Sequence, residues 1–233
     1  LATYYIHADK FFLKNSVENG GYLAIVDGHF GAYQTDKPNG DVKDYTGKWI
    51  APGLVDTHIH GLKGHDVMDN DFDGVKAMSE GLLECGVTSF LPTTLTAAPE
   101  TLNEVIADIG DRHAEVTGAK IQGVFFEGPF FTEEHKGAQN PKYFSDPSLE
   151  IFNHWQELAH GIIKKIAIAP ERKGAKEFTA ALKQQGVKVA LAHSSATYEE
   201  AKEVVEAGAS IFVHTYNGMS PLNHREPGMV GAA

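Results

Sequence analysis

The sequence predicts an α/β fold built on a parallel sheet and preceded by a small β domain. From about residue 50 onward, short apolar runs alternate with helical patterns, which is the arrangement of successive βα units. These runs are apolar nearly throughout, as parallel strands buried on both faces are. Before residue 50 no helical periodicity is visible, and strand-like runs are separated by turn signals. We therefore expect a small, sandwich-like β domain over 1–50 and a larger domain over 51–233.

The strongest local signal of the first 50 residues is the dipeptide Asp27-Gly28, which favours a tight turn. Apolar runs at 21–26 and 29–33 flank this dipeptide, so they are predicted to pair as a hairpin. An earlier run at 4–13 is rich in aromatic and β-branched residues and predicts a further strand.

Six strand–helix units are readable after the β domain. The predicted strands lie at 50–56, 87–92, 121–127, 166–170, 187–193 and 211–216. The helices predicted between them are marked by Gly86, Pro99, Asp146-Pro147, Gly186 and a capping-box pattern at 197–200. This periodicity fits both an open doubly wound sheet and a (β/α)8 barrel. No glycine-rich phosphate loop follows any strand, which removes the commonest reasons for an open sheet.

The composition excludes several classes of function. The chain has 233 residues, with 20 Lys+Arg against 31 Asp+Glu and a formal net charge of −11. This charge argues against a nucleic acid as the main partner, because phosphate neutralisation needs a basic face. No apolar run reaches the roughly 18 residues of a membrane span. The single cysteine, Cys85, cannot form an intramolecular disulfide, so we expect a cytoplasmic protein without membrane association.

Four histidines and one glutamate lie where the predicted strands end. His58 and His60 close the first strand, Glu127 the third and His193 the fifth, and His214 lies in the sixth. In parallel α/β architectures this edge of the sheet is where active sites are built. Residues i and i+2 of a strand point the same way, so His58 and His60 can reach one ion.

Imidazole and carboxylate together form a donor set for zinc and its neighbours. The five residues therefore predict a site for one or two divalent ions, with Glu127 as the bridge when two bind. Taken alone, a His-x-His pair is more often incidental, and a buried His193 or His214 is more often a hydrogen-bonded core residue. The metal prediction therefore depends on the joint placement of all five.

Longer motifs around these residues carry a family resemblance. The run Pro-Gly-Leu-Val-Asp-Thr-His-Ile-His-Gly at 52–61 resembles the metal-binding signature of the amidohydrolase superfamily. Four further motifs narrow the resemblance to the N-acetylglucosamine-6-phosphate deacetylase family. They are Phe-Glu-Gly-Pro-Phe at 126–130, Lys-Gly-Ala-Gln-Asn-Pro at 136–141, His-Thr-Tyr-Asn-Gly-Met at 214–219 and Arg-Glu-Pro-Gly at 225–228. The resemblance runs from about residue 47 to the end of the chain. It implies a (β/α)8 barrel with a small β domain.

The resemblance also implies residue roles. Glu127, His193 and His214 match the principal metal ligands, and His58 and His60 match a second metal position that some members have lost. Ala138 and Gln139 match a pair that contacts the substrate, although some members carry His at the second position. Asn217 and Gly218 match a pair that contacts the sugar. Arg225 matches a residue that binds the sugar phosphate, either in the same subunit or in a neighbouring one. The planar fork of Arg225 suits a phosphate dianion, and a surface salt bridge with Glu226 is the alternative.

The activity implied is hydrolysis of the acetamide of N-acetyl-D-glucosamine 6-phosphate to D-glucosamine 6-phosphate and acetate. The cofactor implied is one or two divalent ions per subunit, with Zn expected first and Fe, Mn, Co or Ni as alternatives. A bound ion lowers the pKa of water and polarises the amide carbonyl. The resemblance also implies a homodimer.

The family's general base and acid is an aspartate at the end of the eighth strand, which we expect beyond Ala233. Only six units are readable, whereas a closed barrel needs about 250 residues, and no terminal helix or cap is predicted after Gly228. We therefore expect an incomplete barrel that is not an active, independently stable enzyme by itself.

Three other interpretations of the sequence are possible. A hydantoinase-like or dihydroorotase-like enzyme would act on a cyclic amide and typically uses a carboxylated lysine as the bridging ligand, a role that Glu127 fills here. A non-catalytic scaffold of the same fold predicts lost ligands, yet all five positions are filled. A purely structural α/β domain with a histidine-rich surface does not account for the clustering at strand ends.

Overall fold

The computed structural model describes residues 3–233 and divides into two compact units, with Gly53 ending the first and Leu54 beginning the second. The first unit is a sheet with no helix among its described residues. Its strands are β1 (Tyr4–Phe12), β2 (Val17–Asn19), β3 (Tyr22–Val26), β4 (His29–Gln34) and β5 (Val42–Ile50).

The predicted hairpin of the first unit is confirmed. Strands β3 and β4 pair antiparallel, and both turn residues, Asp27 and Gly28, have positive φ. Strand β1 pairs antiparallel with β2 and β3 and parallel with β5. Side chains of β1 and β3 form a small core that contains Ile6, Phe11 and Leu23.

The second unit alternates strands with helices. Its strands are β6 (Leu54–Ile59), β7 (Gly61–Leu62), β8 (His65–Asp66), β9 (Val87–Pro92), β10 (Lys120–Ile121), β11 (Val124–Glu127), β12 (Ile163–Ile168), β13 (Lys188–Leu191) and β14 (Ile211–Phe212). Its α-helices are α1 (Phe72–Glu84), α2 (Pro99–Arg112), α3 (Leu149–Leu158), α4 (Ala175–Gln184), α5 (Tyr198–Ala207) and α6 (Gly228–Ala232). Short 3₁₀ turns lie at Val67–Asp69, His113–Glu115, Glu133–His135 and Pro141–Tyr143.

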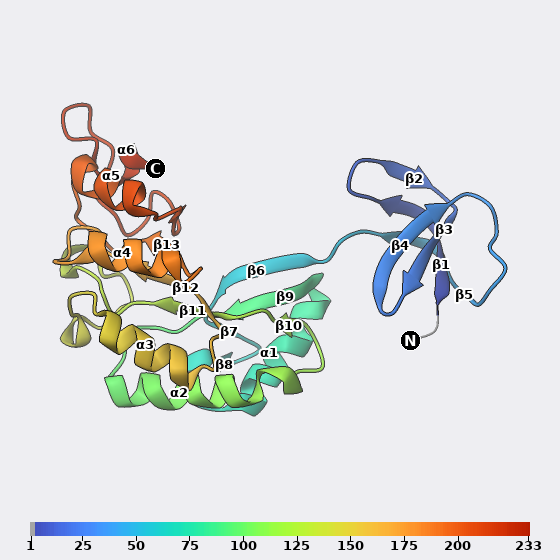
Figure 1. The fold of residues 1–233 in the computed structure, drawn as a ribbon, viewed down its shortest axis with the longest axis horizontal. Helices are drawn as coiled ribbons and strands as arrows, with labels where there is room; N and C mark the ends of the chain where they lie inside the picture. Colours follow the sequence, from blue (N-terminus) through green and yellow to red (C-terminus); the bar gives the residue numbers. More distant parts are fainter. Residues whose placement is uncertain (1–2) are drawn as a thin grey trace. The chain divides into compact units, whose positions relative to one another are not determined.

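The main strands run parallel and follow one another in space as they do in sequence. Strand β6 pairs with β9, β11 with β12, β12 with β13 and β13 with β14. An isolated parallel bridge between Thr93 and Phe125 links β9 to β11. Helices α2, α3 and α4 lie along one side of these strands (Figure 1). Among the described residues this order does not reverse, as it does at the switch point of a doubly wound sheet.

Each face of this sheet carries a core of its own. Under the helices lies the main core, where Phe126, Ile166 and Leu191 pack with apolar residues of α1 to α5. Each such large side chain stabilises the fold by about 1.5–3 kcal/mol when fully buried. The opposite, inner face carries a second cluster, in which Ala167 and Ala190 lie with larger side chains such as Phe125.

Several predicted bounds were wrong. The strand predicted at 50–56 begins at Leu54, because Ile50 ends β5 of the first unit. The strand predicted at 121–127 is broken at residues 122–123, where Gly123 has a positive φ. The strand predicted at 166–170 starts at Ile163, because Lys164 and Lys165 hide its apolar pattern.

The other differences lie toward the chain's end. The strand predicted at 211–216 is only two residues long, since the backbone turns at His214, where φ is positive. A short helix, α6, follows Pro227 although none was predicted there. The capping box of α5 is confirmed, with Thr197 and Glu200 each accepting a backbone N–H of the other. Within the described residues, no helix is long and apolar enough to cross a membrane.

Candidate metal centre

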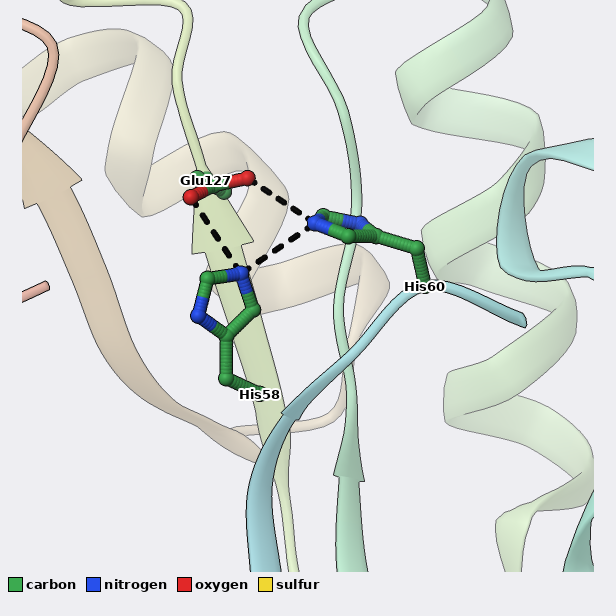
Figure 2. A group of neighbouring side chains, drawn as sticks. All are labelled: His58, His60 and Glu127. Atoms are coloured by element: carbon green, nitrogen blue, oxygen red, sulfur yellow. Dashed lines mark hydrogen bonds and ion pairs between the residues drawn. The ribbon is translucent and has the colours of Figure 1, made fainter. Parts of the chain in front are cut away.

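The five predicted ligand residues converge at one edge of the parallel sheet. His58 lies in β6 and His60 directly follows it, Glu127 is the last residue of β11, and His193 and His214 each lie two residues past the end of a strand. Figure 2 shows His58 and His60 pointing from one segment toward the carboxylate of Glu127. The structure therefore brings together residues that are separated by up to 156 positions in sequence (214 − 58).

The Glu127 carboxylate lies among the four imidazoles. Its Oε1 atom is 3.2 Å from Nε2 of His58 and 3.6 Å from Nε2 of both His193 and His214. Its Oε2 atom is 3.0 Å from Nε2 of His60. Two groups, each with ligand atoms within 4.8 Å of one another, could hold an ion: His58, His60 and Glu127, and Glu127, His193 and His214. Glu127 belongs to both groups, which is the geometry of a bridging carboxylate.

Three of the four imidazoles have their tautomer fixed by a backbone carbonyl. The facing pairs are Nδ1 of His60 with O of Thr93 at 3.1 Å, Nδ1 of His193 with O of His135 at 2.9 Å, and Nδ1 of His214 with O of Asn217 at 2.7 Å. A carbonyl oxygen only accepts, so each Nδ1 carries a proton. The Nε2 lone pair of each neutral ring then faces the centre, as a metal ligand must.

The burial and charge of Glu127 fit a cation as well. The side chain is 3% exposed, and Oε1 accepts no hydrogen bond within the described chain. Burial raises the pKa of this carboxyl, but the four surrounding imidazoles outweigh burial and hold the pKa well below its usual range. A buried anion with an unsatisfied oxygen is unfavourable without a positive partner. Donor chemistry, ring orientation and burial therefore all suit a divalent ion.

The charge of Glu127 also acts on the histidines. Burial lowers the pKa of His60, but the hydrogen bond and charge of Glu127 raise it more, so the net shift is upward. The nearby carboxylate of Glu127 likewise raises the pKa of His214. Protons therefore compete with a metal ion for these two rings.

The backbone at two ligand residues is strained. His193 and His214 have φ values of 45° and 34°, in the left-handed region that side chains other than glycine seldom occupy. Such strain persists only where the surroundings enforce it, and it is concentrated at functional sites. Backbone hydrogen bonds hold both residues, because the His193 carbonyl accepts from Thr132 N and the His214 carbonyl accepts from Asn217 N.

Gln139 lies against the centre, whereas its neighbour Ala138 is exposed. The Gln139 side chain is buried, its Nε2 donates to Oε2 of Glu127 at 3.0 Å, and its Oε1 accepts from Thr96 N at 2.8 Å. Both polar ends of Gln139 are thus engaged inside the protein. The predicted contact of this pair with a substrate stays a prediction.

Asn217 and Gly218 lie beside the two strained histidines. The Asn217 side chain is exposed while its backbone carbonyl holds His214. Gly218 has a φ of 64°, and a Cβ there would lie 3.2 Å from Cε1 of His214 and 3.3 Å from Nδ1 of His193. Glycine is therefore required by both the backbone angle and the close approach of the rings.

Arg225 lies apart from the five converging side chains. It is exposed and lines a cavity of about 380 Å³ together with residues of the α5 N-terminus and the segment 220–228. It forms no ion pair with Glu226 or any other acidic residue within 3–233, so the predicted alternative of a salt bridge with Glu226 is wrong.

Sequence reasoning missed two charged residues near the centre. Lys165 is a buried lysine on the inner face of β12, and its Nζ donates to the carbonyl of Thr57 at 2.7 Å and lies 3.7 Å from the Phe125 ring centroid. Burial lowers the pKa of Lys165 to about 8, although Glu127 and Asp56 oppose this shift. A lysine within an apolar run was the available signal, because lysine is seldom fully buried.

The second residue missed is Glu171, which follows β12. Its Oε2 accepts from Ser194 Oγ and its Oε1 accepts from Ser195 N, both at 2.7 Å. No local pattern marks Glu171, because its partners lie more than 20 positions away in sequence.

Comparisons with known proteins agree on one family. No protein-family model matches the chain. The chain is 38% identical to the N-acetylglucosamine-6-phosphate deacetylase of Vibrio furnissii over 219 residues, which cover 93% of this chain and 53% of that protein. It is 35% identical to the N-acetylgalactosamine-6-phosphate deacetylase of Escherichia coli O157:H7 over 231 residues, covering 99% of this chain and 61% of that protein.

Solved structures give the same result. The crystal structure of N-acetylglucosamine-6-phosphate deacetylase from Pasteurella multocida superposes with a TM-score of 0.89 at 29% identity, covering 99% of this chain and 62% of that one. The chain therefore spans between 53% and 62% of the length of the proteins named here.

Proposed function

We propose that this chain, whose resemblance to the N-acetylglucosamine-6-phosphate deacetylases is confirmed along most of its length, carries the metal centre of such an enzyme. The full protein would hydrolyse the acetamide of N-acetyl-D-glucosamine 6-phosphate to D-glucosamine 6-phosphate and acetate. The observation that carries the proposal is the convergence of four Nε2 atoms on the buried carboxylate of Glu127. The proposed site is His58, His60, Glu127, His193 and His214, and it lies in the unit that begins at Leu54.

A divalent ion bound here would supply Lewis-acid activation of water and of the acetamide carbonyl. The residues of the chain hold and orient the donors. Glu127 supplies the one carboxylate, and its depressed pKa keeps it ionised at neutral pH. The backbone carbonyls that fix the rings of His60, His193 and His214 keep their Nε2 atoms available. We propose zinc as the first candidate ion, because imidazole with carboxylate suits it.

We also propose the residues that bind the substrate. We assign Ala138, Gln139, Asn217 and Gly218 to the sugar and Arg225 to the phosphate, on the family motifs that these residues match. The exposed, unpaired guanidinium of Arg225 supports an anion-binding role in a chain of net charge −11. N-acetyl-D-galactosamine 6-phosphate is the second candidate substrate, since a deacetylase of that name aligns with 99% of this chain.

The other features of the proposal concern the full protein. We propose that further strands close the sheet into a (β/α)8 barrel and supply the aspartate that acts as general base and then acid. We also propose a homodimer and a cytoplasmic location. A cyclic-amide hydrolase is not favoured, because Glu127 fills the bridging position and Lys165 donates to the Thr57 carbonyl instead. A scaffold without catalysis is not favoured either, because the ligand side chains are not only present but assembled.

The test combines metal content with acetate release by the full-length protein. We expect one or two ions per chain, and acetate release from N-acetyl-D-glucosamine 6-phosphate that is lost on chelation and restored by the ion. His193→Ala should abolish acetate release and lower the metal content per chain, whereas His29→Ala, at an exposed position of the first unit, should change neither. Metal without acetate release from either amino-sugar phosphate would redirect the search to other amides. Absence of metal would refute the proposal.

A further inference from the structure

Glu171 links the chain segments that follow three neighbouring strands. It lies three residues after β12, while its partners Ser194 and Ser195 follow His193 at the end of β13. Ser194 is fully buried, and its backbone N donates to Gly218 O while its own carbonyl accepts from Ser220 N. The carboxylate of Glu171 therefore connects, through Ser194, to the segment beyond β14.

The hydrogen bonds of Glu171 are of the strong kind. Both are 2.7 Å long and end on a carboxylate, and bonds to an ionised group are about twice as strong as neutral ones. No Lys, Arg or His of residues 3–233 forms an ion pair with Glu171. The Glu171 carboxylate therefore interacts with the turn at Ser194 and Ser195 and not with a surface cation. Ser195 also donates from Oγ to Glu134, so the turn is held from a second side.

This turn follows directly after the strained backbone of His193. A φ of 45° lies in the left-handed region, which is unfavourable for a residue with a Cβ. The same peptide must also keep the His193 ring with Nδ1 on the His135 carbonyl and Nε2 near Glu127. If the turn relaxed, the ring would move with it, because ring and turn share one backbone segment.

We propose that Glu171 is a positioning residue for the metal ion held by Glu127, His193 and His214, acting by fixing the turn that follows His193. This inference rests on the proposed metal-dependent function and deepens it. Glu171 does not touch the ion. It bonds Ser194 and Ser195 and not the ring of His193, so its loss should lower metal affinity less than the loss of a direct partner of a ligand, which costs about 10- to 100-fold.

The experiment measures affinity for Zn²⁺ and the visible absorption spectrum of the Co²⁺-loaded full-length protein. Glu171→Ala should weaken Zn²⁺ binding by up to about 10-fold and change the Co²⁺ bands, which report ligand geometry. Glu171→Gln should restore most of both readouts, since its Oε1 still accepts from Ser195 N and its amide can donate to Ser194 Oγ. Glu177→Ala is the matched control, because Glu177 is an exposed glutamate of the adjacent helix α4.

The outcomes separate the inference from the proposed function. Wild-type protein without Zn²⁺ or Co²⁺ would refute the metal-dependent function itself. Metal-loaded wild type with an unchanged Glu171→Ala variant would overturn only the role of Glu171. A Glu171→Gln variant as weak as Glu171→Ala would overturn it too, because charge and not the held turn would then matter. If Glu171→Ala does not fold, Ser194→Ala takes its place. This variant removes the hydroxyl that donates to Glu171 Oε2 and leaves the carboxylate in place. Unchanged Zn²⁺ affinity in Ser194→Ala would overturn the inference.

Discussion

The side-chain amide of Gln139 donates to the Glu127 carboxylate across 3.0 Å, so a residue expected to face the substrate orients the central acid of the site. The same amide accepts from Thr96 N. Both bonds are buried, and a change at Gln139 would leave two polar groups without a partner. Gln139 is therefore a test of how far the centre depends on residues outside the ligand set.

Gln139→Leu is expected to lower both stability and metal affinity. Orphaning a buried hydrogen-bonding group destabilises a protein by about 1–3 kcal/mol, and loss of an outer partner lowers metal affinity about 10- to 100-fold. Thermal unfolding and a Zn²⁺ titration check these values. Gln122→Leu, at an exposed position near β10, should leave both unchanged. Full metal affinity in Gln139→Leu would show that Glu127 needs no such support.

Gly218→Ala is expected to disturb two ligands at once. The new Cβ would meet the rings of His193 and His214 at 3.2–3.3 Å, and the positive φ adds roughly 1–2 kcal/mol of strain. Gly86→Ala is the matched control, because Gly86 has a φ of 77° but open space around it. Both variants should lose similar stability, and only Gly218→Ala should lose Zn²⁺ affinity in calorimetry. Equal Zn²⁺ affinity in the two variants would contradict the contact argument.

The two ligand groups should respond separately to histidine removal. His58→Ala leaves Glu127, His193 and His214 intact, so an ion should remain in that group while the other is lost. His214→Ala should have the reverse effect. Metal content per chain, measured after dialysis against excess Zn²⁺, checks this prediction. Complete metal loss in His58→Ala would show that the five residues bind as one unit.

The stabilisation conferred by Zn²⁺ is expected to increase with pH. His60 and His214 have pKa values raised above 6.5, so in the metal-free protein their contribution is complete below pH 6.5 and is lost as pH rises through the raised values. Because the pKa of Glu127 is depressed, the contribution of this carboxylate to stability is present above pH 4.5 and is lost only in strong acid. Metal must displace protons from both rings, so its affinity rises over the same window. The difference between the melting temperatures with and without Zn²⁺ should grow as the pH rises, and a constant difference would contradict this.

The sequence predicted the ligand set because two simple rules apply to it. Side chains two apart on a strand share a face, and parallel strands end at the same edge, so His58, His60 and Glu127 were expected together. Helices α1 to α5 were marked by local capping and proline or glycine signals, as at Pro99 and Thr197. The hairpin at Asp27-Gly28 was equally local.

The remaining features depend on contacts that no local pattern reveals. Lys164 and Lys165 hid the start of β12, because one is exposed and the other is buried through a bond to Thr57, 108 positions away. The positive φ of His193 arises from tertiary hydrogen bonds and not from its residue type. Glu171 resembles any surface glutamate in sequence, and only the fold brings it to Ser194.

The wide spacing of the ligands along the chain has a consequence for how the protein matures. The ligands come from β6, β11 and the segments past β13 and β14, so neither ligand group exists until segments far apart in the sequence have packed together. An ion that binds only the assembled group adds its binding energy to the folded state alone. The group of His58, His60 and Glu127 is complete once β6 and β11 lie together, whereas the group of Glu127, His193 and His214 is complete only after the sheet has formed up to β14. Metal uptake would therefore proceed in two steps, and the second ion would stabilise the last strands to assemble.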